Sequence, residues 1–164
     1  MPFKRFAFDQ KFNGALIDTN LLLLVLVGLF DRSLIGKFKR TQTFESDDFD
    51  KLIGIIANCN GCLYTTPNIL TELTNLTDND TLNKNNTFFQ FLYNFIDQFV
   101  EINVDSKTIV RNNEIAFIKL GLTDASIMNA ATEDILIVTD DLSLYQFLSL
   151  SSKPAINYNH LRFL

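Results

Sequence analysis

Residues 14–20 read Gly-Ala-Leu-Ile-Asp-Thr-Asn and are followed at once by a strongly apolar run, residues 21–30. A short hydrophobic segment that ends abruptly at Asp18 predicts a buried strand that stops at a carboxylate. Asp, Thr and Asn are favoured N-cap residues, so a helix is expected to begin directly after this strand. The same arrangement recurs once, where Ile135–Thr139 is followed by the pair Asp140-Asp141. Two such strands predict one acidic pocket at the carboxyl edge of a parallel sheet.

The composition is that of one ordinary globular domain covering residues 1–164, with 47% apolar and 20% charged residues. The net charge of −5 argues against strong non-specific binding of nucleic acid, unless metal neutralises clustered acids. The basic N-terminus is not followed by a continuous apolar segment, so no signal peptide is expected and the expected location is cytoplasmic. The apolar run 21–30 is about half the roughly 20 residues that cross a bilayer, so a buried helix is expected and no membrane contact.

Strand and helix patterns alternate along the chain, which predicts an α/β domain with a mainly parallel sheet. The residues following Thr66-Pro67 are expected to be helical, because Thr is a good N-cap and Pro suits the first helical position. Gly121 is the expected stop of one helix and Thr123 the expected cap of the next. Further helices are expected over 46–57, 88–100, 106–120, 124–131 and 142–150, further strands over 62–65, 101–104 and 155–158, and a loop over 78–86.

Cys59 and Cys62 form a lone CxxC motif. Zinc would need a second pair of ligands, and the single histidine, His160, lies far downstream without a partner. A redox motif is expected at a helix N-terminus, whereas this one leads into a strand pattern. We therefore expect two reduced cysteines in a turn.

Several acids lie beside the apolar residues of their expected helices and not on the solvated face. Asp124 shares a helical face with Ile127 and Met128, and Glu72 lies at the edge of an apolar stripe. A carboxylate at an apolar boundary is costly unless it is paired, hydrogen-bonded or bound to a cation. No Lys or Arg is interleaved with these acids, so a divalent metal is the expected counter-charge, and all-oxygen ligands favour Mg²⁺ or Mn²⁺ over zinc. Taken singly, Glu72 could be a solvated helix residue and Asp124 an ordinary acid near a helix N-terminus.

Four motifs in this order resemble the PIN domain family, and the resemblance covers essentially the whole chain. The motifs are Ile-Asp-Thr-Asn at 17–20, Thr-Pro-Asn-Ile-Leu-Thr-Glu-Leu at 66–73, Gly-Leu-Thr-Asp-Ala-Ser-Ile at 121–127 and Val-Thr-Asp-Asp at 138–141. The resemblance implies a single PIN-like domain with a parallel five-stranded sheet in the order 3-2-1-4-5, flanked by helices. It makes Asp18, Glu72, Asp124 and Asp141 the catalytic, metal-binding acids and Asn20 and Thr139 supporting polar residues.

In this resemblance Thr139 is placed to hydrogen-bond Asp141. Asp140 then lies at the rim, reaching the metal through water, or caps the helix that starts at Leu142. Adjacent residues at a strand end point to opposite sides, so Asp140 and Asp141 are not expected to aim into one place without a sharp turn.

The implied activity is hydrolysis of RNA phosphodiester bonds by a Mg²⁺- or Mn²⁺-dependent endoribonuclease, as in toxins of bacterial toxin–antitoxin pairs. RNA, an antitoxin-like protein and a second copy of the chain are then candidate partners. Lys37, Lys39 and Arg40 are candidate phosphate contacts, although a charge run alone is often only solvated surface. The alternatives are a non-catalytic PIN-like binding module and a receiver-type phosphoacceptor domain, which also has an acidic Mg²⁺ site but carries its acid pair after the first strand.

Overall fold

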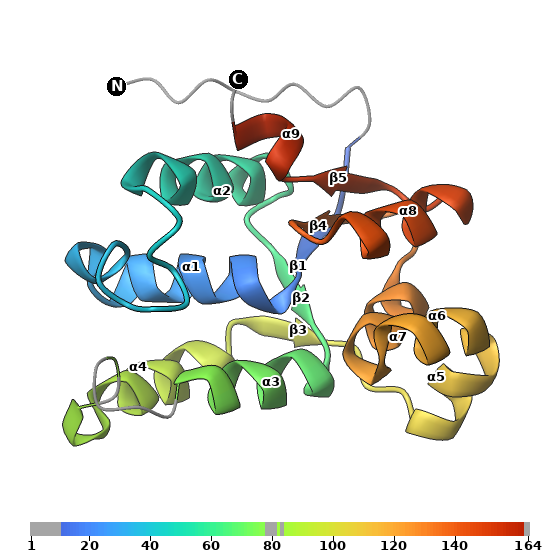
Figure 1. Ribbon diagram of the computed structural model, residues 1–164, viewed down its shortest axis with the longest axis horizontal. Coiled ribbons are helices and arrows are strands. Elements are labelled where there is room, and N and C mark those ends of the chain that lie inside the picture. Colours follow the sequence, from blue (N-terminus) through green and yellow to red (C-terminus); the bar gives the residue numbers. More distant parts are fainter. Residues whose placement is uncertain (1–10, 78–81, 83, 163–164) are drawn as a thin grey trace.

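A five-stranded, all-parallel sheet in the order β3-β2-β1-β4-β5 forms the centre of the structure, a computed structural model that describes residues 11–77, 82 and 84–162 (Figure 1). The strands are β1 (Gly14–Ile17), β2 (Leu63–Thr65), β3 (Phe99–Glu101), β4 (Ile135–Thr139) and β5 (Ala155–Asn157). The α-helices are α1 (Thr19–Phe30), α2 (Ser46–Asn58), α3 (Pro67–Thr77), α4 (Thr87–Ile96), α5 (Ser106–Asn112), α6 (Glu114–Leu120), α7 (Leu122–Ala130), α8 (Leu142–Leu150) and α9 (Asn159–Arg162). The predicted α/β class and strand order are confirmed.

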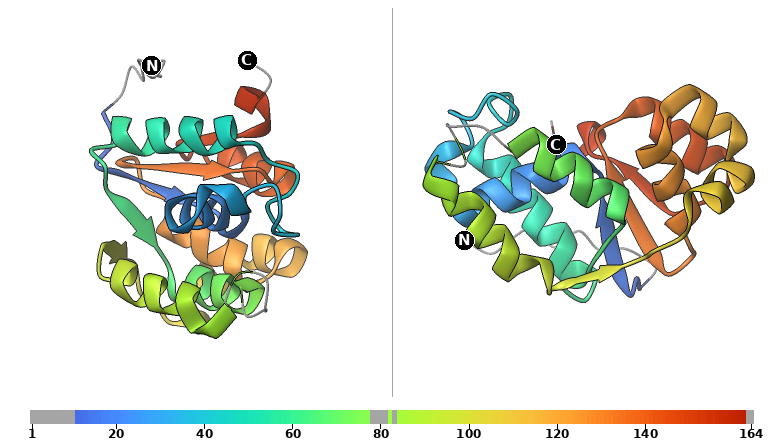
Figure 2. Two further views of the ribbon diagram at one scale, coloured as in Figure 1. Left: turned by 90° about the vertical axis from the view of Figure 1, so that its left-hand side faces the viewer. Right: turned by 90° about the horizontal axis from the view of Figure 1, so that it is seen from below.

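Helices cover both faces of the sheet. The helices α1 to α4 lie on one side and α5 to α8 on the other, as the first view and the view from below both show (Figures 1 and 2). Right-handed crossovers explain this division, because the chain moves outward in one direction from β1 to β3 and in the other from β4 to β5. The reversal of direction falls between β1 and β4, which are direct neighbours in the sheet.

The helix α1 is the centre of the core. Its residues from Leu21 to Val27 are all buried, because α2, α3 and α4 pack around it. A helix that is apolar on every side requires such enclosure. The strands β1 and β4 are likewise buried along their whole length. No helix in the described part of the chain has the length and apolar character needed to span a bilayer.

The third strand lies earlier in the chain than predicted. The helical spacing of Phe88, Leu92, Phe95 and Phe99 predicted one helix over 88–100, but α4 ends at Ile96 and β3 runs from Phe99 to Glu101 instead of 101–104. Pairing with β2 places Phe99 in the sheet, and its ring still contacts Phe95, with the ring centroids 5.4 Å apart. A strand pairing between distant segments therefore replaced the last helical turn, which a local pattern cannot reveal.

The predicted helix 106–120 is divided at Asn113, whose φ of −133° and ψ of 43° break the helical path between α5 and α6. Its side-chain amide donates to the carbonyl of Ile109 at 3.2 Å and to Asn129 at 3.4 Å, which stabilises the non-helical backbone. Gly121 ends α6 as predicted, with a φ of 93°. The next helix, α7, begins directly after Gly121, so the predicted cap at Thr123 is wrong and that residue lies in the first turn.

Two further expectations need adjustment. The helix α2 begins at Ser46 as expected, but its N-cap is Glu45, whose backbone N–H donates to the Asp48 carboxylate at 2.8 Å. The predicted loop 78–86 lies partly outside the described residues, and its described end, Lys84–Asn86, forms a short 3-10 helix, as does Arg32–Leu34. The strand β2 and the helix α3 follow the prediction, with the Thr66 hydroxyl accepting from the backbone N–H of Ile69 at 3.3 Å.

Candidate functional site

Two acids follow the neighbouring strands β1 and β4 at the carboxyl edge of the sheet. Ile17 pairs in register with Val138, so Asp18 and the Asp140-Asp141 pair leave the sheet side by side. From here α1 departs to one face and α8 to the other (Figure 1). In open parallel sheets this is the place where adjacent connections diverge and where ligands bind. The strand order therefore brings the predicted acids to the expected edge.

Asp18 is buried, with 6% of its surface exposed, and three donors hold its carboxylate. The backbone N–H of Leu21 donates to Oδ1 at 3.1 Å, which makes Asp18 the N-cap of α1. The backbone N–H of Asp140 donates to Oδ2 at 2.9 Å, and the hydroxyl of Thr139 donates to the same oxygen. Burial and the nearby charge of Asp140 nevertheless raise the pKa of Asp18 to about 8.

Asp140 and Asp141 face different neighbours, as expected for adjacent residues at a strand end. Burial raises the pKa of Asp140, while side-chain hydrogen bonds with Asp18 and Asn20 act in the opposite direction. Asp141 is exposed, and its Oδ1 accepts from the backbone N–H groups of Ser143 at 2.6 Å and Leu144 at 3.0 Å. The acid that caps α8 is therefore Asp141, and the predicted capping role of Asp140 is wrong.

Thr139 supports Asp18 instead of the Asp141 carboxylate. Its hydroxyl donates to Asp18 and accepts from the backbone N–H of Asp141 at 2.9 Å. The predicted contact between the Thr139 hydroxyl and Asp141 is thus made to the backbone and not to the carboxylate. The other predicted supporting residue, Asn20, hydrogen-bonds Asp140 through its side chain.

Glu72 and Asp124 come from helices on opposite faces of the sheet and meet the other acids at this edge. The hydroxyl of Thr19, directly after Asp18, donates to Glu72 Oε2 at 3.0 Å. Asp124 is half-buried, and burial followed by the charges of Asp141 and Glu72 raises its pKa to about 6. Together these contacts and charge effects connect the acids into one set, which we call the acid cluster: Asp18, Glu72, Asp124, Asp140 and Asp141.

No cationic side chain in the described part of the chain neutralises the acid cluster. The ion pairs there all lie elsewhere, at Arg32–Asp50, Lys51–Asp47 and Arg162–Asp48. The acids are also not gathered as tightly as expected, since within the described ranges no three His, Cys, Asp or Glu side chains are close enough to hold one ion together. The cluster is therefore an extended series of mutually repelling carboxylates.

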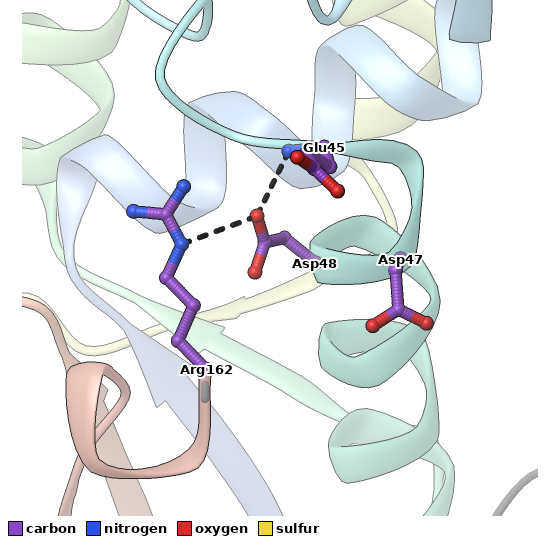
Figure 3. A pocket seen from close by; sticks show the side chains of 4 residues that line it. All are labelled: Glu45, Asp47, Asp48 and Arg162. Atoms are coloured by element: carbon purple, nitrogen blue, oxygen red, sulfur yellow. Dashed lines mark hydrogen bonds and ion pairs between the residues drawn. The ribbon is translucent and has the colours of Figure 1, made fainter. Parts of the chain in front are cut away.

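A second acidic site on the molecule contains a buried carboxylate that, unlike those of the acid cluster, is paired with a cationic side chain of the described part of the chain. Figure 3 shows a pocket lined by Glu45, Asp47, Asp48 and Arg162. Asp48 is buried, lies 3.4 Å from Nε of Arg162 and accepts from the hydroxyl of Tyr158 at 2.8 Å. These contacts attach the C-terminal helix α9 to α2, so Asp48 has a structural role.

The basic residues Lys37, Lys39 and Arg40 lie beyond the far end of α1. This helix has 12 residues, so at about 1.5 Å per residue it carries the chain about 18 Å away from Asp18. The segment 32–43 lies at the end of α1 remote from the sheet (Figure 1). The structure therefore separates the candidate phosphate contacts from the acid cluster.

Cys59 and Cys62 are both free, as predicted, and burial raises the pKa of the Cys59 thiol to about 11. His160 packs its ring edge-on against Tyr145, with the centroids 5.7 Å apart, and joins no metal-binding group in the part of the chain that the structure describes.

Sequence reasoning missed several contacts that hold the acids in place. The carboxylate of Glu72 is bound by Thr19, and the carbonyl of Asp140 accepts from the Asn159 side chain at 2.9 Å. The hydroxyls of Thr66 and Ser126 are hydrogen-bonded at 2.9 Å between α3 and α7. Each joins residues far apart in the chain, and no local pattern marks them, although the cap at Thr66 was recognisable.

Comparison of the chain with protein-family models, with curated proteins and with solved structures gave no match.

Proposed function

We propose that this protein is a PIN-like endoribonuclease that hydrolyses RNA phosphodiester bonds with Mg²⁺ or Mn²⁺. The observation that carries the proposal is the acid cluster at the point where β1 and β4 diverge. Burial and then like charges raise the pKa of Asp124 to about 6, and no cationic side chain among the described residues is paired with the cluster. Like-charged carboxylates without a partner are characteristic of cation and catalytic sites.

The donor set fits a hard divalent cation, because every side chain of the cluster offers carboxylate oxygens and none offers nitrogen or sulfur. Asp18, Glu72, Asp124 and Asp141 would hold the ion, with Asp140 beside them. When bound, such an ion polarises a phosphate and lowers the pKa of a water molecule. The separation of the acids in the described structure means that they would have to move closer together to share it.

Hydrogen bonds from neighbouring residues hold the acids of the cluster in place. Thr139 and the backbone of Asp140 hold Asp18, and Thr19 holds Glu72. One oxygen of Asp141 is engaged in capping α8, which orients the carboxylate. These hydrogen bonds restrict the side chains that would otherwise repel one another, as supporting partners of metal ligands generally do.

The direct test is cleavage of a mixed RNA substrate by the purified protein with Mg²⁺ or Mn²⁺, with EDTA and with Asp18→Asn. Metal-dependent cleavage that both EDTA and the substitution abolish supports the proposal. Cleavage that survives both changes, or its complete absence with either metal, contradicts it. RNA as the substrate would place the protein in the cytoplasm, and two free cysteines suit a reducing compartment.

A non-catalytic PIN-like binding module is the second candidate. It is favoured by the finding that, among the described residues, no three acids are near enough to hold one ion. Binding of RNA without metal-dependent cleavage would support this candidate. If the protein acts as a toxin, a small antitoxin-like protein encoded beside it should co-purify with it. The receiver-type alternative has no support in the fold, because receiver-type sheets have the order 2-1-3-4-5.

A further inference from the structure

A buried pair of hydroxyl groups joins the two helices that carry Glu72 and Asp124. Thr66 Oγ1 and Ser126 Oγ lie 2.9 Å apart, and each residue is 2% exposed. Thr66 directly precedes α3, which carries Glu72, and Ser126 lies two residues after Asp124 in α7. The two helices come from opposite faces of the sheet and pack against each other at this edge.

The surrounding bonds give this contact a direction. The Ser126 hydroxyl donates to the carbonyl of Thr123 at 2.6 Å, so its single proton is used. Thr66 must then donate to Ser126, while its oxygen accepts from the backbone N–H of Ile69 at 3.3 Å. Each hydroxyl thus donates once and accepts once. A buried chain of this kind is fully satisfied and has only one arrangement, which makes it rigid.

The location of Ser126 lets this bond control where Asp124 points. Residues two apart on a helix are separated by about 200° around its axis. Ser126 and Asp124 therefore lie on different sides of α7, and the bond from Ser126 to Thr66, at the start of α3, fixes the rotation of α7 relative to α3. Once the rotation of α7 is fixed, the position of Asp124 relative to Glu72 in α3 is fixed with it. Burial, followed by the charges of Asp141 and Glu72, raises the pKa of Asp124.

We propose that Thr66 and Ser126 are positioning residues that set the separation between Glu72 and Asp124. Neither residue belongs to the acid cluster, and both act only through the orientation of the helices. The effect of this separation on metal binding rests on the proposed function, whereas the separation itself does not.

A double-mutant cycle tests the separation without any metal. Urea midpoints would be measured in EDTA at pH 8, where Asp124 is ionised, for Asp124→Asn, Glu72→Gln and the double variant. Each substitution removes the same repulsion, so the stabilising shift of the double variant should be smaller than the sum of the two single shifts. The cycle is then repeated in the Ser126→Ala background, where the helices are free to relax. There the deviation from additivity should fall by at least half.

Thr77→Val is the matched control. Thr77 is fully buried in α3, but its hydroxyl bonds only to carbonyls of its own helix, those of Leu73 and Thr74. Loss of the Thr77 hydroxyl should lower stability without changing the deviation from additivity between Asp124→Asn and Glu72→Gln. Thr66→Ser, which keeps the hydroxyl, should preserve the deviation from additivity, whereas Thr66→Val should reduce it as Ser126→Ala does. An equal deviation from additivity in wild type, Ser126→Ala and Thr77→Val would overturn the inference.

The consequence for the metal site is measured separately as the affinity for Mn²⁺ alone. Loss of a residue that supports metal ligands commonly costs about 10- to 100-fold in affinity, so Ser126→Ala should weaken Mn²⁺ binding by at least the lower figure and Thr77→Val should not. If wild type binds no Mn²⁺, the proposed function fails while the cycle still decides the positioning role. If wild type binds Mn²⁺ and the cycle is unchanged in Ser126→Ala, only the positioning role is rejected.

Discussion

The hydroxyl of Thr139 at the end of β4 donates to the buried carboxylate of Asp18 at the end of β1. This one bond joins residues 121 positions apart in the chain and connects the two strands at the point where the sheet changes direction. It holds Asp18 in place beside Asp140, even though burial and the charge of Asp140 raise the pKa of Asp18. The fold therefore maintains an unfavourable arrangement of charges, which binding of a cation would compensate.

Metal should stabilise the folded protein. A ligand that binds only the folded state at a hundred times its Kd adds about 2.7 kcal/mol to the free energy of unfolding. Thermal melts should therefore shift upward with Mn²⁺ or Mg²⁺ relative to EDTA, and Asp18→Asn should reduce this shift. Melting curves that are identical in metal and in EDTA would contradict a metal-binding site at these acids.

Without metal, stability should fall as the pH rises. The pKa of Asp18 rises from 3.8 to about 8 and that of Asp124 from 3.8 to about 6 on folding. At these two groups the folded state then binds more protons than the unfolded state, so the stability that they contribute is fully present below about pH 4 and is lost as the pH rises through about 6 for Asp124 and about 8 for Asp18. Urea midpoints measured in EDTA from pH 4 to pH 8 should show the decline.

Asp18→Asn should remove most of that decline above about pH 7, where the titration of Asp124 is nearly complete. Asp134→Asn is the control, because Asp134 is exposed and precedes β4 at the opposite edge of the sheet. A profile of Asp18→Asn that keeps the wild-type slope above about pH 7 would assign the pH dependence to other groups.

The two adjacent acids at the end of β4 should differ in stability and in activity. Asp141→Ala should lower the free energy of unfolding by about 1 kcal/mol because α8 loses its N-cap, whereas Asp141→Asn keeps most of the capping. RNA cleavage should fall by orders of magnitude in Asp141→Asn and by much less in Asp140→Asn, since loss of a metal ligand is more damaging than loss of its neighbour. Equal losses would indicate a shared role, and the reverse order would make Asp140 the ligand.

Replacing Lys37, Lys39 and Arg40 together with Ala should weaken RNA binding across sequences and flatten its salt dependence. Because these residues lie beyond the far end of α1, the cleavage rate at saturating RNA should be retained. Binding measured between low and moderate salt gives the slope. An unchanged salt dependence would mean that these three residues are ordinary solvated surface and do not contact RNA.

Gly28→Ala should destabilise the core although Ala is the better helix former. A Cβ at residue 28 of α1 would clash with the ring of Phe49 on α2, and overpacking of this kind costs about 1–3 kcal/mol. Gly54→Ala in α2 is the matched control, because a Cβ there meets no atom within 4 Å, and it should stabilise by up to about 1 kcal/mol. Chemical denaturation of both variants compares the two effects, and equal shifts would contradict the packing argument.

The local sequence was sufficient to predict an element wherever caps, glycines or an apolar run mark its bounds. The bounds of β4 and α8, the cap at Thr66 and the stop at Gly121 agree with the prediction because caps, Gly and apolar runs act over a few residues. The alternation of strands and helices predicted the α/β class, and the resemblance to PIN domains supplied the strand order that the structure confirms. The placement of Asp18 and Asp140 at one edge follows from that order.

Only the tertiary structure decided what depends on contacts between distant segments. Pairing with β2 turned Phe99–Glu101 into a strand against its helical spacing, and the amide of Asn113 divided a predicted helix. The sheet geometry directed the Thr139 hydroxyl to Asp18 and left the cap of α8 to Asp141. Such bonds depend on the relative position of elements brought together by folding, and no spacing along the chain encodes them.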